Sequence, residues 1–163
     1  MVTLRQMHCG DLAAVSALGI RSKASWGYDE SEMEVFSGEL SLDENSVAGL
    51  LDAQVAVRAG GEIVGYFTLR AHDGGAIELE HLFVDPDHFR RGIGSQLLAA
   101  AEKAAADAGA TELTIICDPN STGFYTKHGA DIVGKHQSSI AGREIPVLQL
   151  WVGGEPDPRG DQH

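Results

Sequence analysis

Residues 84–98 read VDPDHFRRGIGSQLL, and this segment carries the strongest structural signal in the chain. An apolar strand ends at Val84, a turn containing Pro86 follows, and Gly92 and Gly94 lead directly into an Ala/Leu-rich helix. Glycines let the backbone approach a ligand closely, and the first amides of a helix have no partner within that helix. Helix starts of this kind bind anions, so we expect an anionic ligand at this loop.

Two common phosphate-binding motifs do not fit the loop. A dinucleotide fingerprint needs a third glycine three residues after the second, where this chain has Leu97, and a P-loop needs a Gly-Lys-Ser/Thr run that is absent. An unrelated nucleotide-phosphate protein is therefore disfavoured. The order of strand, Pro-containing turn, Arg-Arg-Gly-x-Gly and long helix instead resembles the acetyl-CoA loop of the GNAT superfamily of N-acetyltransferases.

A second segment, NSTGFYTKHGA over residues 120–130, resembles the Asn-x-x-x-Phe-Tyr-x-x-x-Gly-Phe/Ala segment of the same family. The resemblance implies that Asn120 contacts the coenzyme A arm, with Phe124 beside it. It also implies that Tyr125 stands near the sulfur and donates a proton to the leaving thiolate. A phenol with a pKa near 10 and a thiol with a pKa of about 8.5 make this transfer roughly balanced.

The resemblance assigns acetyl-CoA as the co-substrate and divides its binding between a strand and the glycine loop. The backbone of Leu82, Phe83 and Val84 would pair with the pantetheine arm as an added strand. The pyrophosphate would bind the backbone amides of Arg90, Arg91, Gly92, Ile93, Gly94 and Ser95. The chain departs from the family at Phe89, where Gln or Arg is usual, so we expect Arg90 and Arg91 to supply the positive charge.

Transfer to an amine also needs a proton acceptor, because an alkyl ammonium with a pKa of ~10 has no lone pair for attack. Many family members use an acidic residue on the strand before the loop, which here carries Glu78 and Glu80. Strict alternation puts both acids on one face together with Leu82 and Val84. We favour Glu80, with Glu78 second; a bulge in this strand would change the parity and with it could reverse the choice between the two acids. His81, of opposite parity, is a reserve candidate.

The first third of the chain is expected to supply the acceptor site. Trp26 and Tyr28, with Asp29 or Glu30, could form an aromatic and anionic wall for an amine. The acceptor itself, a small-molecule or peptide amine, is not identified by the sequence. A non-catalytic module that binds coenzyme A or acyl-CoA remains the alternative function, and a homodimer through the last strands remains open.

Composition limits the domain organisation, the partners and the cellular location that the chain can have. The 163 residues, 43% of them hydrophobic, fit one domain over residues 1–152 with a flexible tail over residues 153–163. An excess of 24 acidic over 12 basic residues disfavours nucleic acid as a partner. The chain has no apolar run of the ~18 residues that a membrane helix needs, so we expect a cytoplasmic protein without a membrane partner. Cys9 and Cys117 are expected to be buried free thiols, and their spacing predicts no metal site.

Hydrophobic periodicity predicts an α/β (α+β) fold with a mixed, mostly antiparallel central sheet flanked by helices. Capping boxes at Ser31/Glu34 and Ser41/Glu44 predict two short helices that end near Leu40 and Leu51. The strands on either side of the glycine-loop helix should run parallel through a right-handed crossover. The expected strands are residues 2–8, 55–58, 63–71, 77–84, 113–117, 132–137 and 145–152. One main helix is expected from Leu12 to about Lys23, and the other follows the glycine loop and stops at Gly109. This order of elements resembles the GNAT fold.

Overall fold

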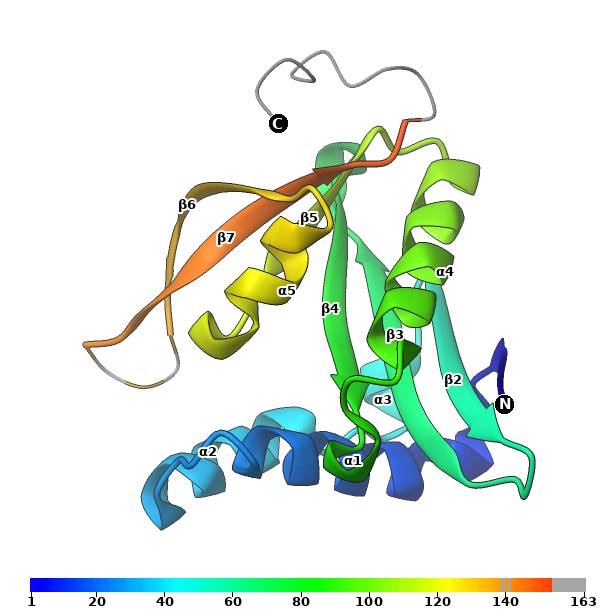
Figure 1. Cartoon of the computed structure of the whole chain (residues 1–163). Coiled ribbons are helices and arrows are strands. Elements are labelled where there is room, and N and C mark those ends of the chain that lie inside the picture. Colours follow the sequence, from blue (N-terminus) through cyan, green and yellow to red (C-terminus); the bar gives the residue numbers. More distant parts are fainter. Residues whose placement is uncertain (139, 141, 154–163) are drawn as a thin grey trace.

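The structure, a computed structural model, describes residues 1–138, 140 and 142–153. Its centre is a seven-stranded sheet with the order β1-β2-β3-β4-β5-β7-β6 (Figure 1). The strands are β1 (Val2–Gln6), β2 (Asp52–Arg58), β3 (Ile63–Ala71), β4 (Ile77–Val84), β5 (Glu112–Ile116), β6 (Asp131–Gln137) and β7 (Glu144–Trp151). Neighbouring strands are antiparallel except β4 and β5, which are parallel. The expected mixed, mostly antiparallel sheet is confirmed.

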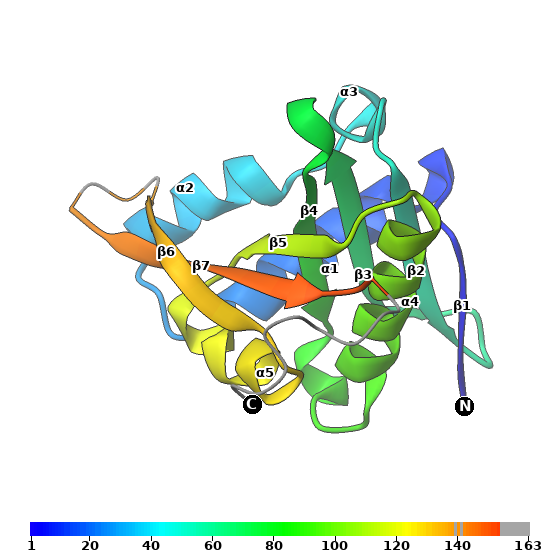
Figure 2. The same ribbon diagram turned by 90° about the horizontal axis from the view of Figure 1, so that it is seen from above.

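Helices cover both faces of the sheet, as Figure 2 shows. The helices are α1 (Leu12–Ala24), α2 (Glu30–Leu40), α3 (Glu44–Val47), α4 (Ile93–Asp107) and α5 (Thr122–Lys127). Phe67 of β3 belongs to the core cluster that includes α4, whereas the adjacent Tyr66 belongs to the cluster that includes α1. Alternate side chains of one strand therefore serve two cores, because successive residues point to opposite faces.

The sheet opens between its two parallel strands. β4 pairs with β5 only from Ile77 to Leu79, whereas its pairing with β3 continues to Val84. Beyond Leu79 the two strands diverge, and Figure 1 shows β5 leaving β4 together with β6 and β7. The second half of β4 therefore offers one backbone edge that no strand covers, directly before the glycine loop.

A β-bulge interrupts the ladder at the same place. Thr68 lies opposite His81, but the next residue of β3, Leu69, lies opposite Leu79, which leaves Glu80 as an extra residue in β4. A bulge of this kind changes which face the following side chains occupy.

The bulge overturns one expectation from strict alternation. Glu78 and Glu80 were expected to share a face with Leu82 and Val84. In the structure Leu82 and Val84 pack against the α4-side core, the core that also holds Ile77 and Leu79 from the start of the strand. The parity of the second half of β4 is therefore reversed relative to its first half.

Two helix starts also differ from the sequence expectation. The carboxylates of Asp29 and Asp43 cap α2 and α3, each accepting a backbone N–H from three residues later at 2.8 Å. The expected caps Ser31 and Ser41 lie inside α2 and directly after it. The helix near Leu40 ends as expected, but α3 ends before Leu51. An aspartate that reaches the free amides first takes the cap, since Asp is at least as good an N-cap as Ser.

The two cysteines have different environments. Cys117 is buried, as expected, but Cys9, which was also expected to be buried, is exposed in the short segment between β1 and α1. Residues 154–163 of the expected tail lie outside the described residues. Within the described residues, the helices are too short or too polar to cross a membrane.

Candidate active site

The glycine loop has the backbone geometry that its composition predicts. Gly92 precedes the first residue of α4 with φ 79°, and Arg90 also has a positive φ of 65°. Left-handed residues of this kind favour glycine and let the chain turn sharply into a helix. The amides at the start of α4 are left without acceptors inside the helix, and the helix dipole adds partial positive charge there.

A groove of about 650 Å³, which we call the α4 groove, runs along the start of α4. All but one of the residues expected to bind coenzyme A line it. They are Leu82, Phe83, Val84, Arg90, Gly92, Ile93, Gly94, Ser95, Asn120, Phe124 and Tyr125. Arg91 is the exception and lines a separate hollow beside the N-terminus. The two sequence motifs, which residues 99–119 separate in the chain, thus line one groove, as the family resemblance implied.

Two observations test whether a phosphate-bearing chain fits this groove. A Cβ added at Gly94 would lie 3.3 Å from the Phe124 ring, so only glycine leaves the backbone open at this point. The Nδ1 of His88, another lining residue, is buried and lies 4.0 Å from an Asp85 carboxylate oxygen, so this nitrogen is not presented to the groove. The tight backbone cradle and the free amides at the start of α4 are therefore the features that fit an anionic group.

Side chains hold α4 and α5 together across the groove. The ring of His128 contacts the Phe124 carbonyl oxygen through Nδ1 at 2.9 Å and Ser95 Oγ through Nε2 at 3.0 Å. A carbonyl only accepts, so Nδ1 carries a proton and donates it to this oxygen; in the neutral ring, Nε2 then accepts from the Ser95 hydroxyl. Ser95 therefore keeps its backbone amide for a ligand while its side chain fixes the groove.

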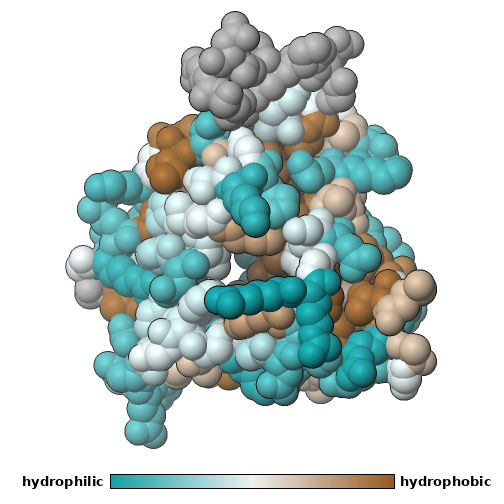
Figure 3. All heavy atoms as spheres, in the orientation of Figure 1, coloured by the Kyte–Doolittle hydropathy of each residue, from teal (hydrophilic) through white to brown (hydrophobic). Residues whose placement is uncertain are grey.

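A second hollow of about 330 Å³, which we call the α2 pocket, lies between α2, the diverging strands β4 and β5, and the β6–β7 hairpin. It shares Leu82, Phe83, Ser121 and Tyr125 with the α4 groove. Figure 3 shows the molecule hollowed near the centre of the view. A ligand in the groove and a second molecule in the pocket would meet at these shared residues.

Tyr125 lies at this meeting point. The side chain is almost fully buried and packs edge-on against Phe124, with ring centroids 5.1 Å apart. Burial raises the pKa of the Tyr125 phenol, so the hydroxyl stays protonated. Burial of the coenzyme thiol beside this ring would shift its pKa in the same direction.

The three candidate bases of β4 all line the α2 pocket, but each has a partner. Glu80 accepts a 2.6 Å hydrogen bond from Arg70 Nε, and Glu78 contacts His72 Nε2 at 2.7 Å. His81 contacts Thr68 Oγ1 at 3.0 Å, and desolvation by burial lowers its pKa against the opposing effect of Glu80 and Glu78. His81 is therefore neutral at pH 7, and Glu80 is the acid nearest to the shared residues along the strand.

Trp26 and Tyr28 do not form one wall. Trp26 lines the α4 groove, where it stacks on Phe89 with ring centroids 6.2 Å apart. The apolar Phe89 thus has an aromatic partner at the position where the family usually has a polar residue. Tyr28 packs edge-on against Phe36, a lining residue of the α2 pocket, at 4.8 Å between centroids.

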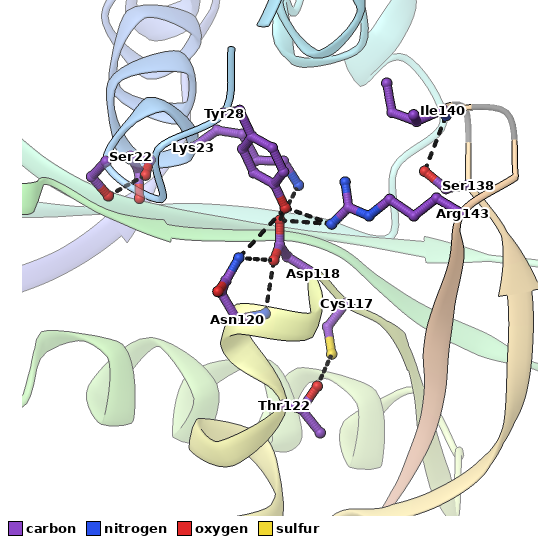
Figure 4. A network of polar contacts seen from close by, with 11 residues as sticks. Ser22, Lys23, Tyr28, Cys117, Asp118, Asn120, Thr122, Ser138, Ile140 and Arg143 are labelled. Carbon is purple, nitrogen blue, oxygen red and sulfur yellow. Dashed lines mark hydrogen bonds and ion pairs between the residues drawn. The ribbon is translucent and has the colours of Figure 1, made fainter. Parts of the chain in front are cut away.

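A polar cluster in the α2 pocket was missed by the sequence reasoning (Figure 4). Lys23 Nζ contacts Asp118 Oδ2 at 2.7 Å, and Arg143 reaches the same carboxylate at 3.7 Å. Tyr28 donates to Asp118 as well. These residues are spread over more than 100 positions and lie in no local motif, so only the fold brings them together. Within the described residues, His, Cys, Asp and Glu form no group of three that could hold a metal ion.

Comparison with protein families agrees with this geometry. A family model described as "Acetyltransferase (GNAT) family" matches residues 20–130. The chain is 34% identical over 96 residues to the uncharacterised N-acetyltransferase YjcF of Bacillus subtilis (strain 168). That match covers 59% of this chain and 66% of the relative, slightly less than two thirds of its length.

Solved structures share the fold. A GCN5-related N-acetyltransferase from Rhodopseudomonas palustris superposes with a TM-score of 0.77 at 25% identity, covering 91% of this chain and 94% of that one. The PaiA N-acetyltransferase from Thermoplasma acidophilum, solved in complex with coenzyme A, gives a TM-score of 0.73 at 19% identity over 93% of this chain and 99% of that one. The fold expected from the order of elements is confirmed.

Proposed function

Because the chain belongs to the GNAT family of acetyltransferases, we propose that it transfers an acetyl group from acetyl-CoA to a primary amine of a small molecule or peptide. The observation that supports this function best is the meeting of two hollows at Leu82, Phe83 and Tyr125. A donor bound in the α4 groove and an amine bound in the α2 pocket can then react directly in one ternary complex. Holding both reactants in place supplies much of the catalysis.

The donor is held mainly by the backbone in this proposal. The uncovered edge of β4 at Leu82, Phe83 and Val84 pairs with the pantetheine amides, and the amides of residues 90–95 bind the pyrophosphate. A backbone N–H near Leu82 or Phe83 stabilises the oxyanion that forms on the thioester carbonyl. Asn120 stands at the groove, where its side chain also contacts Asp118 and Tyr28.

Glu80 is the proposed proton acceptor, acting through a water molecule. Its carboxylate is one-quarter exposed in the α2 pocket and is oriented by Arg70. Glu80 lies closer along β4 to the shared residues than Glu78, which supports the choice between them. Removal of the proton leaves the amine neutral, and its nitrogen then attacks the thioester carbonyl carbon.

Tyr125 completes the reaction as the proposed proton donor. As the carbon–nitrogen bond forms, the carbon–sulfur bond breaks and the sulfur takes the proton of the Tyr125 hydroxyl, which is later replaced from solvent. The burial of Tyr125 keeps water from competing for the sulfur and keeps the phenol protonated beforehand. The ammonium loses one proton to Glu80 before the attack, and the nitrogen loses a second to solvent as the amide forms. One proton returns from solvent to the Tyr125 phenolate and the one on Glu80 is released, so the net products are the amide, the free thiol and one proton.

Calorimetry with acetyl-CoA, followed by a thiol-release assay with a panel of amines, tests the proposal. We expect binding and thiol release that depends on the added amine. The absence of both binding and thermal stabilisation by acetyl-CoA would contradict it. Binding without thiol release for any amine would support the non-catalytic coenzyme A module.

A homodimer through the last strands remains a prediction. β6 lies at the edge of the sheet, and its Ile132 and Val133 are 58% and 51% exposed. Exposed apolar side chains on an edge strand favour pairing with another chain. Sedimentation analysis of the protein and of Ile132→Lys measures this, and a monomer at all concentrations would exclude it.

A further inference from the structure

The polar cluster of Lys23, Asp118 and Arg143 takes no part in the chemistry proposed above, yet it forms one end of the α2 pocket. Lys23 comes from α1, Asp118 follows β5, and Arg143 directly precedes β7. Figure 4 shows the Arg143 side chain extending from the β6–β7 hairpin toward Tyr28 and Asp118. All three side chains are largely shielded from solvent, with exposed fractions of 13%, 6% and 21%.

The acceptor capacity of Asp118 is already used. Its Oδ2 accepts from Lys23 Nζ and from the Tyr28 hydroxyl, and its Oδ1 accepts from the backbone and side-chain amides of Asn120. These four donors match the roughly four lone-pair sites of a carboxylate. Burial alone would raise the pKa of Asp118, but the bonds from Lys23 and Tyr28 lower it overall, so the group is ionised.

Arg143 is left with unused donors. Its guanidinium donates one hydrogen bond to a described residue, to the Tyr28 hydroxyl, and lies 3.7 Å from Asp118 without a hydrogen bond to it. A guanidinium carries five N–H donors. Two cations therefore share one carboxylate, and the second cation lines the pocket with N–H donors that no residue in the described part of the chain accepts.

Aromatic rings fix the position of both cations. The guanidinium carbon of Arg143 lies 4.9 Å from the centroid of the Tyr28 ring, and Lys23 Nζ lies 4.3 Å from that of Phe36. Cation–π contacts of this kind are stronger where the cation is shielded from water. The donors of Arg143 are thus held in place before any ligand arrives, which lowers the cost of binding one.

Among the residues that line the α2 pocket outside this cluster, which are mostly apolar or neutral, the carboxylates carry the opposite charge. Glu78 and Glu80 of β4 and the exposed Glu39 of α2 all line it. A dianionic ligand such as a phosphate ester would be repelled by these acids, and a polyamine would bring a second ammonium toward Arg143. A small molecule with one ammonium and one carboxylate can place its ammonium near these acids and its carboxylate near Arg143.

From this arrangement we infer that the acceptor is an amino-acid-like molecule whose carboxylate binds Arg143, with Lys23 beside it, while its amine lies toward Glu80. The inference rests on the proposed acetyltransferase function and names the class of amine that the α2 pocket takes. A pocket of about 330 Å³ suits a ligand of this size better than a folded protein surface.

Matched acceptors test the carboxylate directly. Thiol release from acetyl-CoA is measured with alanine, methionine, glutamate and lysine, each against its own carboxamide, and with propylamine and spermidine as amines without a carboxylate. We expect kcat/KM for at least one amino acid to exceed that for its carboxamide by about tenfold or more. Equal values for every pair, or a preference for spermidine, would overturn the inference.

Arg143→Gln distinguishes recognition from a general defect. We expect KM for the preferred amino acid to rise at least about tenfold with kcat nearly retained, while the values for its carboxamide and the affinity for acetyl-CoA stay unchanged. Lys103→Gln removes a positive charge from the exposed face of α4, outside both hollows. This control should change neither the kinetic constants for the amino acid and its carboxamide nor the affinity for acetyl-CoA. An equal loss for acid and carboxamide in Arg143→Gln would contradict carboxylate binding.

A binding measurement covers the case in which turnover is absent. In the presence of coenzyme A, the preferred amino acid should raise the melting temperature more than its carboxamide does, and Arg143→Gln should remove the difference. No stabilisation by any of the four amino acids would overturn the inference even if acetyl-CoA binds. Failure of acetyl-CoA itself to bind would instead overturn the proposed function.

Discussion

The α4 groove and the α2 pocket share four residues, but they are built in different ways. The groove is formed mostly by two continuous segments, residues 82–95 and 120–128, and its main ligand groups are backbone amides. The pocket takes charged side chains from α1, α2, β4 and the β6–β7 hairpin. The donor site can therefore be recognised from local motifs, whereas the acceptor site depends on long-range contacts. Substitutions can therefore disrupt the α4 groove and the α2 pocket separately.

The largest effect is expected from Gly94→Leu, which closes the groove. A side chain at Gly94 would overlap the Phe124 ring, which already lies 3.3 Å from an added Cβ. We expect the affinity for acetyl-CoA in calorimetry to fall by more than about 1,000-fold, or ~4 kcal/mol. Gly60→Leu, in a turn with open space around it, is the matched control and should bind normally. Normal binding by Gly94→Leu would exclude the start of α4 as the donor site.

Tyr125→Phe probes the point where the two hollows meet. Loss of the proton donor should lower kcat by about 1,000-fold, while the shape of the groove and the affinity for acetyl-CoA are retained. Because burial raises the pKa of the phenol, the wild-type rate should show no decline from Tyr125 ionisation up to about pH 10. Single-turnover and steady-state thiol release measure both effects. Turnover equal to wild type would remove Tyr125 from the mechanism.

Glu80→Gln removes the proposed proton acceptor from the α2 pocket. We expect kcat/KM to fall by about 100-fold near neutral pH and to recover as pH rises, since an amine with a pKa of ~10 then deprotonates without a base. Glu78→Gln, which removes the neighbouring acid of the same strand, should have a smaller effect. The pH profiles of both variants measure the difference, and the reverse order would transfer the role to Glu78.

The smallest effect is expected at the rim of the groove. Trp26 is 39% exposed and stacks on Phe89, so acetyl-CoA binding should change its fluorescence. Trp26→Phe should lose this signal and weaken affinity by less than about threefold, since one aromatic ring replaces another. Trp151→Phe should keep the signal, because Trp151 lines neither hollow. A signal that survives in Trp26→Phe would show that Trp26 does not report on the groove.

Local patterns predicted most of the fold and nearly all of the groove. Gly92 and Gly94 were identified from their neighbours, because helix starts and tight turns depend on nearby backbone angles, whereas Asn120 and Tyr125 came from the resemblance to a family segment. Strict alternation failed in β4, where Glu78 and Glu80 were expected to share a face with Leu82 and Val84. A bulge is a property of the pairing between two strands, and alternation within β4 alone does not contain it.

Local sequence patterns predicted the mixed sheet and the glycine loop with its free amides, and the family resemblance pointed to Tyr125 in a second motif. Only the tertiary structure placed Trp26 on the groove and brought Lys23, Asp118 and Arg143 into one cluster in the pocket. The physical reason is the range of the interactions. Backbone donors are presented by local conformation, whereas ion pairs between distant positions exist only once the order of the strands has brought them within a few ångströms.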